Sequence, residues 1–118
     1  MILVDTSIWV DHLRYGNREL AALLDEGDAA VHPFVIGELA CGSMRNRREI
    51  IALLQELPSA PEVEHGGFMV FVDRHHLWGL GLGFVDVHLL ASSSLAGIPL
   101  WTADKMLFSA AFKLGLSR

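Results

Sequence analysis

Cysteine is almost absent from this chain of 118 residues, in which Cys41 is the only one. One cysteine excludes an intramolecular disulfide and favours a reducing environment, so we expect a cytoplasmic protein. We expect Cys41 itself, which follows an apolar segment, to be a small buried side chain. The uncharged stretches at residues 29–37 and 87–103 are interrupted by proline and histidine, which excludes a membrane span. The apolar start of the chain also lacks the basic region of a signal peptide.

Positive charge is scarce as well. The chain has 9 Lys and Arg against 14 Asp and Glu, for a net charge of −5. This balance excludes a nucleic-acid binder that works through bulk positive charge, but it allows a nuclease whose acids are covered by metal. With 52% hydrophobic residues, the sequence can fill a core, and its length predicts one domain over residues 1–118.

Short apolar strands alternate with helical segments along the chain. We expect strands at residues 2–5, 29–32 and 98–102, with at most a short edge strand within 61–65. We expect helices after Asp5 up to Gly16, and at residues 17–26, 33–42, 45–57, 66–80, 84–96 and 104–114. The order predicts an α/β protein, a three-layer α/β/α sandwich with a short central parallel sheet.

Four acidic residues occupy the junctions of this pattern: Asp5, Glu38, Asp86 and Asp104. Each ends a strand or lies within the first turns of a helix. Because the carboxyl ends of parallel strands meet at one edge of a sheet, we expect the four side chains to converge there. Each position also has a simpler explanation. Asp5 and Asp104 suit helix caps, Asp86 suits the dipole of a helix start, and Glu38 suits a solvated face.

Glu38 stands in a segment that is otherwise apolar. Between Pro33 and Gly42 it is the only ionisable side chain apart from Cys41, so a solvated helix face would consist of little else. We therefore expect Glu38 to be buried. A buried carboxylate is costly unless a metal or a hydrogen-bond donor compensates its charge.

Clustered carboxylates repel one another unless a cation neutralises them. Mg²⁺ and Mn²⁺ prefer oxygen ligands and retain several waters, so a site of two to four carboxylates suits them. Such a site can activate water for attack on a phosphodiester and stabilise the leaving oxygen. The four acids therefore predict metal-dependent hydrolysis of a nucleic acid.

Four segments carry these acids in a recognisable order: ILVDTS at 2–7, PFVIGEL at 33–39, FVDVHLLA at 84–91 and LWTADK at 100–105. Together they cover the chain from end to end and resemble the PIN-domain ribonucleases of the VapC toxin type. The resemblance implies Asp5 and Asp86 as primary metal ligands, Glu38 as a ligand or water-orienting base, and Asp104 as the fourth acid. It also implies that Ser7 and Thr102 offer hydroxyls to the site.

The resemblance further implies a toxin of a toxin-antitoxin pair, an endoribonuclease that uses Mg²⁺ or Mn²⁺ and is inhibited by a cognate antitoxin protein. Many relatives have another acid where this chain has Met106, so a second metal ion has fewer ligands here. The apolar face of residues 45–57 predicts an interface, and we expect a homodimer. The arginines at 45, 47 and 48 suit either RNA phosphates or solvent.

A different class of function remains open from the residues alone. An acidic pocket can serve a binding module without catalysis, such as a receiver-like phosphoacceptor domain that uses Asp5 and Lys105. This alternative lacks the paired acids wanted after Asp5, and it gives Glu38 no role.

Overall fold

The computed structural model describes residues 1–118. Its sheet has three short parallel strands, β1 (Ile2–Val4), β2 (Ala29–Ala30) and β3 (Leu100–Trp101), in the order β2-β1-β3. Leu3 pairs with Ala30 on one side and with Leu100 on the other. The central strand is therefore β1, whose wholly apolar sequence suits a strand that is covered on both faces.

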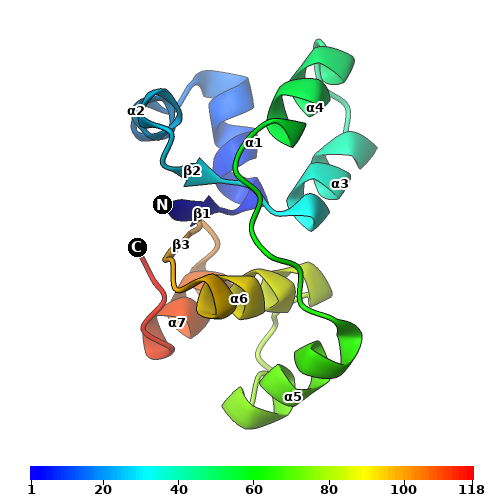
Figure 1. Ribbon diagram of the computed structural model, residues 1–118, viewed down its shortest axis with the longest axis vertical. Helices are drawn as coiled ribbons and strands as arrows, with labels where there is room; N and C mark the ends of the chain where they lie inside the picture. The colour runs from blue at the N-terminus through cyan, green and yellow to red at the C-terminus, as the bar shows by residue number, and fades with distance from the viewer.

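Helices form the two outer layers (Figure 1). On one side lie α1 (Thr6–Tyr15), α2 (Arg18–Glu26), α3 (Pro33–Cys41) and α4 (Arg47–Gln55). On the other side lie α6 (Phe84–Ala96) and α7 (Lys105–Lys113), and α5 (His65–His75) packs against α6. The predicted α/β/α sandwich with a parallel sheet is confirmed. None of these helices combines the length and the apolar character needed to cross a membrane.

Polar residues set the starts of several helices. Asp5, Asn17 and Asp104 accept hydrogen bonds from the first turns of α1, α2 and α7. Such N-caps satisfy backbone N–H groups that have no partner within the helix. The predicted helix at 17–26 is α2 together with its cap Asn17, and the predicted helix at 104–114 is α7 together with its flanking residues Asp104 and Leu114. The prediction for 84–96 matches α6.

His32 caps α3 with an imidazole ring. Its Nδ1 accepts a hydrogen bond of 2.9 Å from the Phe34 N–H, so the ring proton is on Nε2, 3.0 Å from the Ser92 hydroxyl. Burial, with a smaller effect of His88, lowers the pKa of His32 to about 4. A neutral, packed histidine therefore ends the β2 segment, and β2 stops at Ala30 before reaching the predicted end at residue 32.

The structure differs from the sequence predictions mainly at the ends of elements. The expected helix at 66–80 starts at His65 and ends at His75, because His76 takes a left-handed conformation with φ 55°. Residues 61–65 form no edge strand, and Val31 instead makes a single bridge to Ser59. The predicted helix at 45–57 is shorter at both ends in α4.

Candidate active site

Asp5 lies at the carboxyl end of the central strand and is only 5% exposed. Its Oδ2 accepts hydrogen bonds from the Ser7 hydroxyl at 2.6 Å and the Thr102 hydroxyl at 2.7 Å, and a longer one from the Ser7 N–H at 3.4 Å. These donors come from the start of α1 and the end of β3. One carboxylate oxygen is therefore fixed in place.

The two hydroxyls also accept hydrogen bonds from the backbone beyond β3. Ser7 Oγ accepts from the Ala103 N–H, and Thr102 Oγ1 accepts from the Asp104 N–H, each at 3.0 Å. The β1–α1 and β3–α7 junctions, far apart in the sequence, are thus joined through two side chains. Ser7 and Thr102, whose hydroxyls the family resemblance placed at the site, do contact Asp5.

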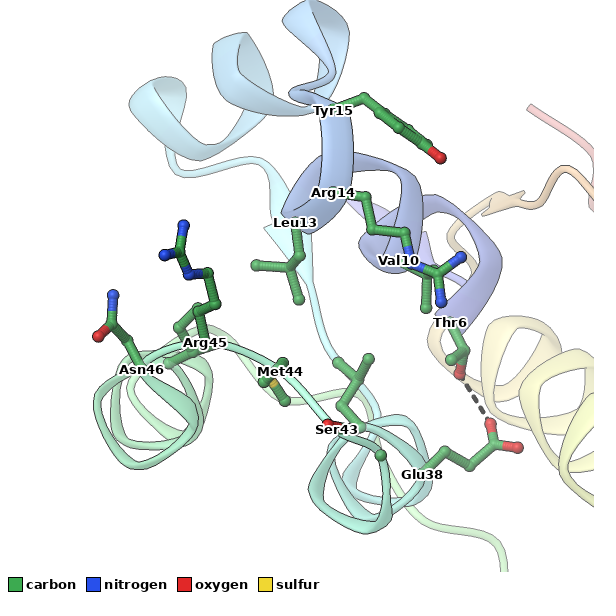
Figure 2. A pocket seen from close by; sticks show the side chains of 13 residues that line it. Thr6, Val10, Leu13, Arg14, Tyr15, Glu38, Ser43, Met44, Arg45 and Asn46 are labelled. Atoms are coloured by element: carbon green, nitrogen blue, oxygen red, sulfur yellow. Dashed lines mark hydrogen bonds between the residues drawn. The ribbon is translucent and has the colours of Figure 1, made fainter.

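Glu38 projects from α3 near the start of α1. Its Oε1 accepts a hydrogen bond of 2.7 Å from the hydroxyl of Thr6 (Figure 2). The prediction that Glu38 is buried is wrong, because the side chain is exposed together with Gly37 and Cys41. The prediction of a buried Cys41 is wrong for the same reason. A glycine, a glutamate and a cysteine form the solvated face of α3, which a count of ionisable residues does not detect.

Asp86 lies in the first turn of α6 and is half-buried. Its Oδ2 accepts a hydrogen bond of 2.9 Å from the Gly83 N–H. Burial raises the pKa of Asp86, and the carboxylates of Asp5, Asp104 and Glu38 raise it further, against the lowering effect of the Gly83 hydrogen bond. The four acids are therefore close enough for their charges to interact.

Asp104 is the exposed N-cap of α7. Its Oδ1 accepts a hydrogen bond of 2.9 Å from the Leu107 N–H. The capping explanation is thus correct for Asp104, and also for Asp5 at α1. In both residues the second carboxylate oxygen has no hydrogen-bond partner within the protein.

All four acids use their two carboxylate oxygens in the same way. One oxygen of each carboxylate accepts a hydrogen bond from the protein, and the other oxygen has no such partner. An oxygen-only donor set with one free oxygen per side chain fits a hard divalent cation. No group of three or more His, Cys, Asp or Glu side chains is arranged closely enough to hold an ion. The assignment of the four acids as metal ligands therefore stays a prediction.

Thr6 is a site residue that the sequence analysis did not single out. Its signal was its place directly after Asp5, where a first-turn hydroxyl can reach a neighbouring helix. Met106 does not act as a substitute ligand. Its methyl group lies 3.2 Å from where a Cβ on Gly81 would be, so it packs against the loop that leads into α6.

A parallel α/β/α sandwich with interacting carboxylates at the carboxyl edge of its sheet defines a small α/β protein with an acidic site. The sequence pattern of the PIN domain family matches residues 2–113. The chain therefore belongs to the PIN domain family.

Relatives support this placement. Ribonuclease VapC32 from two Mycobacterium tuberculosis strains, CDC 1551 / Oshkosh and ATCC 25618 / H37Rv, is 46% identical over 118 residues, which covers 99% of this chain and 95% of each relative. FitAcB from Neisseria gonorrhoeae has a similar fold, with a TM-score of 0.64 and 19% identity over 95% of this chain and 94% of the other. The predicted VapC-type ribonuclease is confirmed, and the receiver-like alternative gains no support.

Proposed function

We propose that this VapC-type ribonuclease cuts RNA with Mg²⁺ or Mn²⁺ bound by Asp5 and Asp86, assisted by Glu38 and Asp104. The observation that carries the proposal is the raised pKa of Asp86, which burial causes in the first place and to which the other three carboxylates add. Carboxylates that raise the pKa of a neighbouring acid by their negative charge form a site that a divalent cation stabilises. The relatives, named ribonucleases, supply the substrate class.

The protein's own hydrogen bonds orient each acid for this role. Ser7 and Thr102 hold Asp5 Oδ2, which leaves Oδ1 for metal. The Gly83 N–H holds Asp86 Oδ2 in the same way. These donors act as outer-shell groups, which fix the direction of a ligand and tune its basicity.

Glu38 differs from the two aspartates because it is exposed and bonded only to Thr6. Its free Oε2 is available to accept the proton of an attacking water, while the Thr6 hydroxyl fixes Oε1. A bound Mg²⁺ or Mn²⁺ would lower the pKa of that water and stabilise the negative charge on the phosphate and leaving oxygen. We assign Glu38 as the general base or water-orienting residue, and Asp104 as a supporting acid.

Similarity to VapC ribonucleases also suggests protein partners for the chain. We propose that an antitoxin protein inhibits the chain and that two copies associate through exposed apolar side chains. The apolar face of residues 45–57, predicted as an interface, packs largely within the chain, because Leu54 is buried and Ile50 and Ile51 contact the core. Phe108 and Phe112 on α7, 45% and 67% exposed, and Leu95 on α6, 65% exposed, are candidates for contacts with another chain instead. We also propose a cytoplasmic location, where RNA is available.

The test is RNA cleavage by the purified chain with Mg²⁺ or Mn²⁺, read as newly formed RNA 5′ ends. We expect cleavage to stop with a chelator and to fall by about a hundredfold or more in Asp5→Asn and Asp86→Ala. Asp73→Asn is the matched control, because Asp73 is an exposed aspartate on α5 and is not among the carboxylates that raise the pKa of Asp86. Cleavage by Asp5→Asn at the wild-type rate would contradict the assigned site.

A further inference from the structure

A cavity of about 730 Å³ lies between α1 and the α3–α4 connection, beside the acidic site. Thr6 and Glu38, joined by their hydrogen bond, form one end of it, and Arg45 and Asn46 lie across from them (Figure 2). A molecule that reaches Glu38 can therefore extend directly into this cavity.

Two unpaired cations line the cavity. Arg14 comes from the last turn of α1 and Arg45 from the segment before α4, and both side chains are exposed. The only ion pair in the structure joins Arg118 and Glu19, so neither guanidinium has a carboxylate partner. Figure 2 shows the Arg14 side chain extending toward the Thr6 end of the cavity. In a chain with a net charge of −5, the two arginines outnumber the one carboxylate of the lining, Glu38, and give the cavity a local excess of positive charge.

The remaining lining suits a flat apolar group. Tyr15 is 81% exposed at the rim, and its ring contacts no other aromatic ring of the protein. Val10, Leu13 and Met44 give the cavity apolar walls. Arginine with an unstacked aromatic ring is the combination by which proteins bind single-stranded nucleic acid, through its phosphates and bases.

We propose that this cavity binds the RNA nucleotides next to the scissile bond. Arg14 and Arg45 contact backbone phosphates, and Tyr15 stacks against a base as the strand leaves Glu38. The proposal rests on the proposed ribonuclease function. A single RNA strand uses the cations and the aromatic ring together, whereas an acidic protein segment uses only the arginines.

The experiment measures binding of a fluorescein-labelled, mixed-sequence, single-stranded RNA by anisotropy over a salt series, in an Asp5→Asn background that prevents cleavage. Arg14→Ala and Arg45→Ala should each raise Kd about fivefold. Each should also reduce the slope of log K against log salt by about 0.7, the value for one phosphate on a single strand. Tyr15→Ala should raise Kd about tenfold without changing the slope, and Tyr15→Phe should bind like its parent.

Arg74→Ala on α5 is the matched control, because Arg74 is an exposed arginine without an ion pair and does not line the cavity. It should leave both Kd and the slope unchanged. Equal losses in Arg74→Ala and Arg14→Ala would overturn the proposal, since bulk charge would then explain the binding.

Cleavage by otherwise wild-type protein is measured in parallel to separate the two proposals. RNA binding that depends on the cavity, without any metal-dependent cleavage, would contradict the proposed function and leave the cavity as an RNA site. Normal cleavage, with Kd unchanged in all three cavity variants, would overturn the cavity proposal alone. The cavity proposal is also overturned if those variants lose binding only to an acidic peptide, tested as polyglutamate.

Discussion

Two threonines donate hydrogen bonds of equal length to carboxylates of the site, but in different surroundings. Thr102 donates to the buried Asp5 at 2.7 Å, and Thr6 donates to the exposed Glu38 at 2.7 Å. The value of a hydrogen bond depends on the water that competes for its partners. Replacing each threonine with valine, which has the same shape, therefore compares one interaction in two environments.

The buried bond should matter more for stability. Thr102 is only 8% exposed, so Thr102→Val removes a donor that water cannot readily replace. A hydrogen bond to a charged group is worth roughly 1.5–3 kcal/mol, and we expect a loss of about 2 kcal/mol. The Asp104 N–H also loses its acceptor, Thr102 Oγ1. In Thr6→Val, water can solvate Glu38, so the loss should stay below about 1 kcal/mol.

The measurements are urea and thermal unfolding in a chelator, followed by RNA cleavage with metal. For a domain of this size, we expect Tm to fall by about 8 °C in Thr102→Val and by less than about 4 °C in Thr6→Val. Cleavage should fall in both variants, because each loses the donor that orients a site carboxylate. A fall in cleavage with little loss of stability in Thr6→Val would therefore show that Thr6 acts in the active site and not in holding the fold together.

The reasoning fails if Thr6→Val lowers the free energy of unfolding as much as Thr102→Val does. It also fails if Thr102→Val is neutral, because Asp5 would then not depend on the bonds that join the two junctions. A Thr102→Ser variant keeps the hydroxyl and serves as the control. It should recover most of the lost stability and cleavage.

Two further predictions concern titratable groups. The raised pKa of Asp86 means that its charged form opposes folding at neutral pH. Asp86→Asn should therefore raise the midpoint of urea unfolding, measured in a chelator, and should abolish cleavage. A lower urea midpoint in Asp86→Asn would contradict the inference that the four carboxylates repel one another. The pKa of His32, lowered to about 4 from 6.5, means that its stabilising effect is complete above pH 6.5 and is lost as pH falls toward 4. Urea unfolding should show a loss of about 2 kcal/mol between about pH 7 and 5, and His32→Asn, which can still cap α3, should weaken this dependence.

Much of the fold could be predicted because local signals agree with the tertiary structure. The apolar run before Asp5, and Asp5 itself as a cap residue, mark β1 and the start of α1 without reference to the rest of the chain. The end of α5 could not be predicted in this way. It depends on His76 taking a left-handed conformation, which histidine adopts without a clear sequence signal.

The site, like the fold, has some features that local sequence signals predict and others that depend on tertiary packing. Strand ends predict which acids approach one another, because parallel strands place their carboxyl ends at one edge. They do not predict the contact between Thr6 and Glu38, which are 32 residues apart and meet only because α1 packs against α3. Nor do they predict the exposure of Glu38, which follows from how α3 is rotated about its axis.

The sequence posed a choice for Asp5 and Asp104 between capping a helix and binding a metal. A carboxylate has two oxygens, and each cap here uses one of them, Oδ2 in Asp5 and Oδ1 in Asp104. The capping bond fixes the side chain at the edge of the sheet and so gives the second oxygen a defined position. Helix capping by Asp5 and Asp104 therefore supports a role as metal ligands. A carboxylate that is not held by a capping bond would lose more conformational entropy on binding a cation.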